Sequence, residues 1–127
     1  MAATDIIARL GGWAGYEVSA TREEQRGGAR WCVVELAAKG RVSRCCSGCG
    51  RSTHAVHDAQ ERRIRDLPIF EVPVELVLPR LRVRCPACGP KLEALDWLDP
   101  YARVTRRLAV SVARMCKVMS IRHVAAF

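Results

Sequence analysis

The sequence lacks the features of a secreted or membrane-anchored chain. Residues 1–30 contain no basic start followed by an unbroken apolar run, and no apolar stretch approaches the roughly 20 residues that span a bilayer. Internal repeats, low-complexity tracts and an acidic tail are also absent. These absences predict a cytoplasmic protein without a membrane partner, and its 127 residues fit one domain of ordinary size.

Signs of catalysis are lacking as well. The thirteen carboxylates form no paired constellation, and no thiol lies in a nucleophile signature. We therefore predict that this chain is not an enzyme and has no small-molecule substrate.

Lysine is scarce, because only three of the 21 basic residues are lysine and the others are arginine. A GC-rich genome explains the arginine preference as well as selection for binding does. The formal net charge of +8 is more informative. Four zinc-bound thiolates and their ion would still leave about +6. This surplus predicts a polyanionic partner such as DNA, since clustered cations release the counterions condensed on nucleic acid.

The chain also lacks an even number of cysteines. It has seven, and no secretion signal accompanies them, so a disulfide framework is disfavoured and reduced thiols or metal ligands are expected. Two motifs have matching spacing: Cys46 and Cys49 in "CSGCG", Cys85 and Cys88 in "CPACG". Two intervening residues let a tight turn direct both sulfurs at one ion, and the glycine that follows each pair permits the turn.

Four soft thiolates favour one structural Zn²⁺, with iron as the main competitor. A site closed by four protein ligands has no open position for water, which excludes a hydrolytic role. Cys45 offers an alternative spacing to Cys49, and His54 or His57 could replace a sulfur, although neither alternative reproduces the twin turn. We expect Cys45 to be a strand residue and both histidines to be exposed. Cys32 and Cys116 are expected to be small buried groups.

Residues 1–42 predict a short helix and a β-hairpin. The stretch "TDIIARLGG" has Thr4 as a possible cap and ends in two glycines. The stretches "YEVSA" and "ARWCVVELA" read as strands joined by the polar turn "TREEQRGG".

Residues 43–97 predict a zinc ribbon whose two cysteine motifs are joined by short strands, "RRIRDLP", "FEVPVELVLP" and "RLRVRC". Alternation along the last strand places three arginines on one face, while the opposite face leads into the metal site. This basic face consists of Arg80, Arg82 and Arg84.

Residues 98–127 begin with a predicted helix that has Asp99 as its cap and Pro100 at its first position. Ser120 then caps a second apolar segment, "IRHVAAF". One flank of the first helix is basic and is either a solvated face or a phosphate-contacting face. That flank carries Arg103, Arg106, Arg107, Arg114 and Lys117.

The order of these motifs resembles the amino-terminal region of bacterial insertion-sequence transposases of the ISL-three type. The resemblance rests on "CSGCG", "VHDAQERRIRDLPIFEVPVELVLPRLRVRCPACG", "YARVTRRLA" and "SIRHVAAF", and it runs from about Gly15 to the last residue. It implies that Cys46, Cys49, Cys85 and Cys88 are the zinc ligands and that "SIRHVAAF" is the first helix of a helix-turn-helix. The family's recognition helix and its carboxylate catalytic domain would follow beyond Phe127, so DNA cleavage is not assigned to this chain.

The predicted fold class is therefore α+β: a small β-rich zinc ribbon with an N-terminal hairpin, followed by a helix and the truncated start of a helix-turn-helix. The resemblance implies a bacterial, nucleoid-associated protein that grips the DNA of its element's ends. About five phosphate contacts would give a log–log salt slope near −4.5. The alternative is a ribbon for protein contacts, either self-association or binding to a longer transposase. An iron-bearing electron carrier is a third reading.

Overall fold

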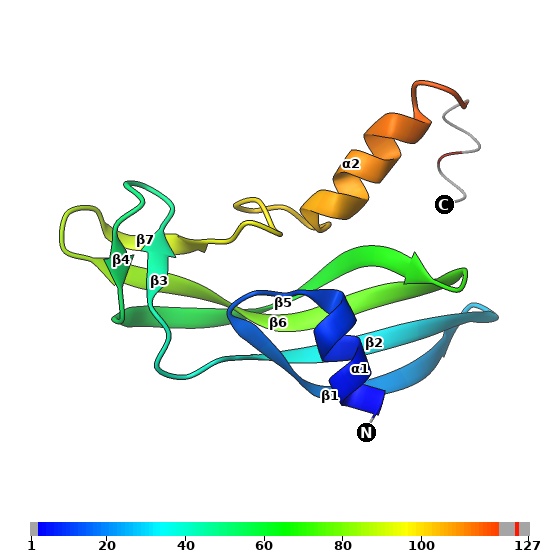
Figure 1. Ribbon diagram of the computed structural model, residues 1–127, viewed down its shortest axis with the longest axis horizontal. Coiled ribbons are helices and arrows are strands. Elements are labelled where there is room, and N and C mark those ends of the chain that lie inside the picture. The colour runs from blue at the N-terminus through cyan, green and yellow to red at the C-terminus, as the bar shows by residue number, and fades with distance from the viewer. Residues whose placement is uncertain (1–2, 120–123, 125–127) are drawn as a thin grey trace.

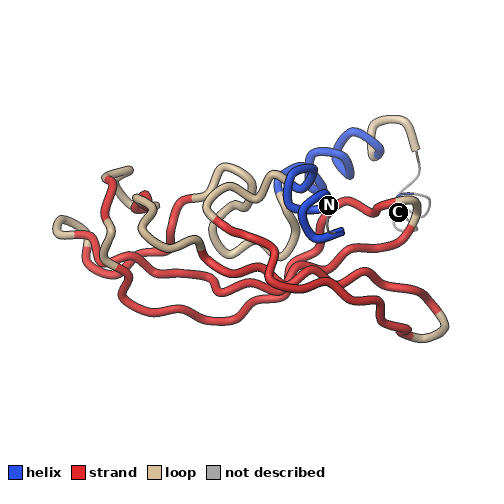
Figure 2. The backbone as a smooth tube through the Cα atoms, turned by 60° about the horizontal axis from the view of Figure 1, so that its bottom comes forward, coloured by secondary structure: helices blue, strands red, loops and turns tan. Residues whose placement is uncertain are grey.

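The computed structural model describes residues 3–119 and residue 124 (Figure 1). Within them, seven strands form one sheet system and two helices lie on the same side of it (Figure 2). The elements are α1 (Ala3–Gly11), β1 (Tyr16–Arg26), β2 (Ala29–Ala38), β3 (Arg44–Cys46), β4 (Ser52–Thr53), β5 (Val56–Ile69), β6 (Val72–Cys85), β7 (Gly89–Ala94) and α2 (Arg106–Met115). The chain is thus β-rich, as its composition of β-branched segments predicts.

A long antiparallel hairpin of β5 and β6 is the spine of the sheet. On its other edge β6 has two partners in succession: β2 pairs with it in parallel at residues 74–77, and β7 pairs antiparallel at residues 82–85. Pro79 lies between these two paired stretches. Proline has no N–H to donate, and it is tolerated there because neither β2 nor β7 pairs with β6 at that position.

The prediction of three short strands between the cysteine motifs is wrong, because these residues form only two strands, β5 and β6. The reversal between them consists of Phe70 and Glu71, whose φ values of 49° and 66° suit a two-residue hairpin turn. Neither residue is a usual turn residue, so local sequence rules do not predict a turn at this position.

The predicted eight-residue turn of the first hairpin is also too long. Strand β1 continues to Arg26, and only Gly27 and Gly28 make the turn, with φ of 55° and 81°. Polar residues that resemble a loop are here strand residues with cross-strand partners. Arg22 Nη1 lies 2.8 Å from Glu35 Oε1 on β2, for example.

Helix α1 begins at Ala3, ahead of the predicted cap Thr4, and Gly12 follows its end with a φ of 65°. Its neighbour Trp13 belongs to the main hydrophobic core, which lies between the sheet and the segments that cover it. The buried core residues are Trp13, Tyr16, Val34, Leu36, Ile64, Val74, Leu76, Leu78 and Leu98. A much smaller cluster of Cys46, Val83 and Cys85 lies in the ribbon.

The predicted start of the C-terminal helix is wrong. Thr105, rather than Asp99, is the N-cap of α2. The preceding residues form an extended segment, because Arg65 N donates to Arg103 O at 3.0 Å and Thr105 N donates to Arg65 O at 2.9 Å. Tyr101 has a φ of 62°, which no helix accommodates. The predicted segment "SIRHVAAF" lies outside the described residues except for Val124, which is buried.

Candidate metal centre and nucleic-acid interface

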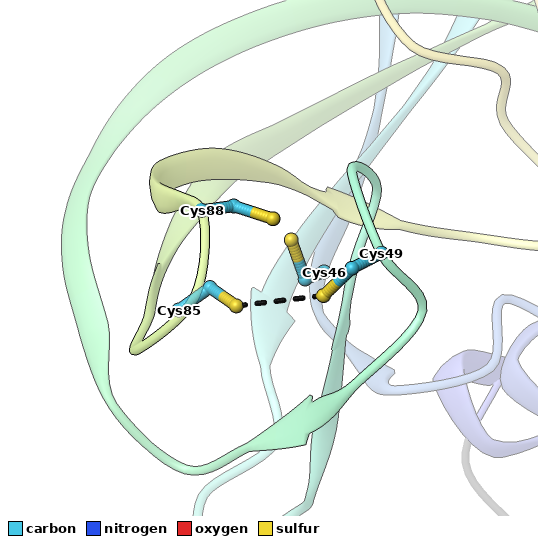
Figure 3. Close-up of side chains that lie close together, drawn as sticks. All are labelled: Cys46, Cys49, Cys85 and Cys88. Carbon is cyan, nitrogen blue, oxygen red and sulfur yellow. Dashed lines mark hydrogen bonds between the residues drawn. The ribbon is translucent and has the colours of Figure 1, made fainter.

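Two tight turns bring the four predicted metal ligands together (Figure 3). The first turn follows β3 and carries Cys46 and Cys49, and the second connects β6 to β7 and carries Cys85 and Cys88. The four Sγ atoms all lie within 4.8 Å of one another, and those of Cys49 and Cys85 are 3.5 Å apart. Zinc–sulfur bonds of about 2.3 Å in a tetrahedron require sulfur separations of about 3.8 Å. The cluster therefore has the size and the donor set for one zinc ion.

The second turn stabilises the thiolate of Cys85 but not that of Cys88. Backbone N–H groups of Cys88 and Ala87 lower the pKa of Cys85 to about 7. Hydrogen bonding with Cys49 and, as the second cause, burial raise the pKa of Cys88 to about 12. Four thiols this close cannot all ionise without a cation between them, because each thiolate disfavours the next. Zinc supplies that charge when bound.

Gly48 is a site residue that sequence reasoning missed. A Cβ atom on Gly48 would lie 3.3 Å from Cys88 Sγ and 3.5 Å from Cys46 Sγ. Its backbone N–H also lies 3.3 Å from Cys46 Sγ. The sequence drew attention to Gly50 and Gly89, which do have positive φ, but the approach of Gly48 to a sulfur 40 residues away depends on the folded ribbon.

The other candidate ligands lie outside the cluster. Cys45 is an exposed residue of β3, and His54 and His57 are exposed. Cys32 is half-buried, whereas Cys116 is exposed, so the prediction of a buried Cys116 is wrong. It follows directly after the last residue of α2, where no described element covers it.

The predicted basic face of β6 is only partly open. Arg82 and Arg84 are exposed, but Arg80 is buried with 5% of its surface accessible. All three share the face that also carries Leu76 and Leu78 of the main core, so Arg80 lies where the core is covered. The face that carries Arg80 is therefore not open at this residue, and its contact with DNA stays a prediction.

Three further predicted DNA-contacting arginines are engaged by carboxylates. Arg82 pairs with Asp58 and Arg106 pairs with Asp99, and both pairs are about half exposed. Arg107 pairs with the buried Asp66. Four exposed predicted contacts have no carboxylate partner among the described residues: Arg84, Arg103, Arg114 and Lys117.

Asp66 fastens α2 to the sheet. Its carboxylate accepts hydrogen bonds from Trp13 Nε1 at 2.9 Å, Thr105 Oγ1 at 2.7 Å and Arg107 Nε at 2.7 Å. Burial opposes ionisation, yet the hydrogen bonds, chiefly from Arg107 and Thr105, hold the pKa of Asp66 below its ordinary value. Thr105 Oγ1 also accepts from Leu108 N, so the same hydroxyl caps the helix and joins it to β5.

A second buried network connects the ribbon to the main core. Glu93 of β7 accepts from Arg44 Nη1 of β3 at 2.6 Å and from the hydroxyl of Tyr16 at 2.8 Å. Burial, with the charge of Glu93, raises the pKa of Tyr16. The positions of β3 and β7 are therefore fixed to β1 as well as to each other.

No helix in the described part of the chain is both long and apolar enough to cross a membrane.

Residues 43–88 match the family model of the zinc-finger of transposase IS204/IS1001/IS1096/IS1165, and residues 93–127 match the helix-turn-helix domain of transposase family ISL3.

The chain is also similar to a transposase for insertion sequence element IS1001 from Bordetella parapertussis, with 40% identity over 123 residues. The matched region is 96% of this chain but only 30% of that relative's length. No solved structure matches the chain significantly.

Proposed function

Because this chain belongs to the ISL3 family of transposases and its ribbon holds one structural zinc ion, we propose that it is a DNA-binding portion of a transposase that acts on element ends. The match of residues 93–127 to a helix-turn-helix domain is the observation that carries this proposal. The chain spans 30% of the relative's length, and the proposed role is binding without catalysis.

In this proposal Cys46, Cys49, Cys85 and Cys88 are the zinc ligands. The ion has no free coordination position when all four sulfurs bind it, so its contribution is structural. It fixes the turns that end β6 and begin β7, and thereby the positions of Arg82 and Arg84 on β6.

Exposed cations on the ribbon and on α2 would contact phosphates, while base contacts would come from the helix-turn-helix. Arg84, Arg103, Arg114 and Lys117 are available without breaking an ion pair in the described residues. Arg82 and Arg106 would first have to leave exposed carboxylates, which costs little because exposed pairs contribute about 0 to 1 kcal/mol. Arg107 instead has the structural role of holding Asp66.

The salt dependence of binding tests the proposal. Four phosphate contacts give a log–log slope of about −3.6, lower in magnitude than the value expected from the sequence. We expect this slope for the zinc-loaded chain and a short duplex, measured by fluorescence anisotropy. Replacing Arg114 and Lys117 by Gln should reduce its magnitude by about 1.8. The control Arg22→Gln/Arg30→Gln removes the same charge from the β1–β2 hairpin and should leave the slope unchanged; a slope near zero in the unmodified chain would contradict the proposal.

A protein-contact role is the second candidate. The turn between β5 and β6 exposes Phe70 by 94% and Ile69 by 40%, and this exposed apolar pair is the observation that favours a contact surface. Sedimentation at high salt distinguishes this candidate, because self-association through Phe70 would persist there and be lost in Phe70→Ser.

A further inference from the structure

A cleft of about 540 Å³ lies on the side of the sheet that carries the main core. Its floor is formed by β5 and β6 and one wall by the segment that precedes α2. Four of its lining residues are arginines, against one carboxylate: Arg62, Arg63, Arg80 and Arg103, with Glu61. Arg63 forms an ion pair with Glu75 at 2.8 Å, but the other three arginines have no ion-pair partner among the described residues. Three arginines without an ion pair against one carboxylate give the cleft a net positive charge.

Arg80 is the unusual member of this group. Only 5% of its surface is exposed, and its two terminal nitrogens have no hydrogen-bond partner among the described residues. Glu93, the carboxylate whose charge acts on Arg80, is already bound by Arg44 and Tyr16. A buried guanidinium without hydrogen bonds is costly, and an anion bound beside it would supply the missing acceptors.

The surroundings of Arg80 suit a phosphate. Gln60 pairs with Arg80 across the β5–β6 ladder, so Arg62 lies on the same face, one diagonal step away. Arg62 is held by Gln60 Oε1 at 3.0 Å. Tyr101, 84% exposed and with a left-handed backbone, stands at the rim of the cleft with its ring available to a base. Non-glycine residues in this conformation concentrate at binding sites.

We propose that this cleft binds a phosphate of the DNA backbone through Arg62, Arg80 and Arg103, with Tyr101 against the neighbouring nucleotide. The proposal rests on the proposed function for DNA as the source of the phosphate. The recognition itself requires only a tetrahedral oxyanion, because guanidinium groups bind phosphate oxygens in pairs.

The test is an amide NMR titration of the zinc-loaded chain, first with inorganic phosphate and then with a short duplex. Both ligands should shift the amides of residues 61–63 and 101–103. Arg62→Gln/Arg103→Gln should raise the half-saturating phosphate concentration about tenfold. The matched control Arg22→Gln/Arg30→Gln should change it less than about twofold. Phosphate shifts that avoid the cleft, or that survive the double substitution, would overturn the proposal.

The two ligands separate this inference from the proposed function. Phosphate shifts in the cleft without any duplex binding would retain the anion site and reject the DNA-binding role. Duplex binding with shifts confined to α2 and the ribbon would retain that role and reject the cleft.

Arg80→Met tests whether Arg80 is a binding residue or a structural one. Since its terminal nitrogens have no described partner, an apolar side chain should leave the urea midpoint unchanged or raise it. The same substitution should abolish the phosphate response of the cleft. A lower midpoint with an intact phosphate response would overturn the assignment.

Discussion

At the scale of single residues, adjacent cysteines have different roles. Cys46 is buried in the ribbon and its Sγ lies within the sulfur cluster, while Cys45 is exposed on the other face of β3. Alternation along a strand explains the difference, since successive side chains point to opposite faces. A thiol one position away from a ligand is therefore a matched control for it.

We expect Cys85→Ser to reduce bound zinc from one ion per chain to a small fraction of that, because a hydroxyl is a poor ligand for zinc where a thiolate is lost. Cys45→Ser should keep the full zinc content. Elemental analysis after dialysis against a weak chelator measures both. Zinc retained by Cys85→Ser, or lost from Cys45→Ser, would show that the ligand set is different.

At the scale of elements, α2 is attached to the sheet by hydrogen bonds to one carboxylate, Asp66, more than by its own apolar packing. Its buried apolar contact within the described helix is Leu108, so most of the helix is not packed against the sheet. Asp66 supplies the link instead, through the cap residue Thr105 and through Arg107. The orientation of the helix-turn-helix relative to the ribbon should depend on this carboxylate.

Asp66→Asn should lower the free energy of unfolding by about 2 kcal/mol at pH 7, because it weakens charged hydrogen bonds to a buried group. The pKa of Asp66 is lowered in the folded state, so its stabilisation is present above about pH 4 and is lost as the pH falls through the folded value. The difference between the two proteins should therefore shrink at low pH in urea unfolding experiments.

The control for this change is Asp58→Asn, which breaks the exposed pair with Arg82. It should cost less than about 1 kcal/mol at any pH. Equal effects of the two substitutions would mean that Asp66 is not a special anchor for α2.

At the scale of the whole molecule, stability is divided between two unequal cores. Among the described residues, the main core has nine buried members, whereas the ribbon cluster has three, two of which are cysteines of the sulfur cluster. In small metal-dependent domains, structural zinc contributes an apparent folding free energy of about 10 to 16 kcal/mol. The ribbon should depend on the ion, while the sheet around the main core has an apolar interior of its own.

Chelation should therefore disorder one end of the molecule first. In hydrogen exchange after zinc removal, we expect amides of residues 44–53 and 85–94 to lose protection, because their strands are short and meet at the sulfur cluster. Amides of residues 33–36 and 74–78 should remain protected by the main core. Uniform loss of protection would show one cooperative unit, and no loss would show that zinc is not structural.

How far the sequence predicts this molecule depends on the range of the interactions. The spacing of the two cysteine pairs and their glycines is local chemistry, and it predicted the four sulfurs that the folded chain brings together. β-Branched segments predicted a β-rich chain, and the glycine pair after residue 10 predicted the end of α1. Strand lengths were mispredicted because polar residues of β1 and the Phe70–Glu71 turn follow no local rule.

The sequence alone thus determined the metal chemistry, the β-rich class and the positive charge, since each depends on residue type and short spacing. Only the tertiary structure decided which arginines are available. Arg80, Arg82 and Arg107 look alike in the sequence, yet one is buried, one holds an exposed carboxylate and one holds a buried carboxylate. The carboxylate partners of Arg82 and Arg107 lie 24 and 41 residues away in the chain, so these pairings exist only in the folded molecule.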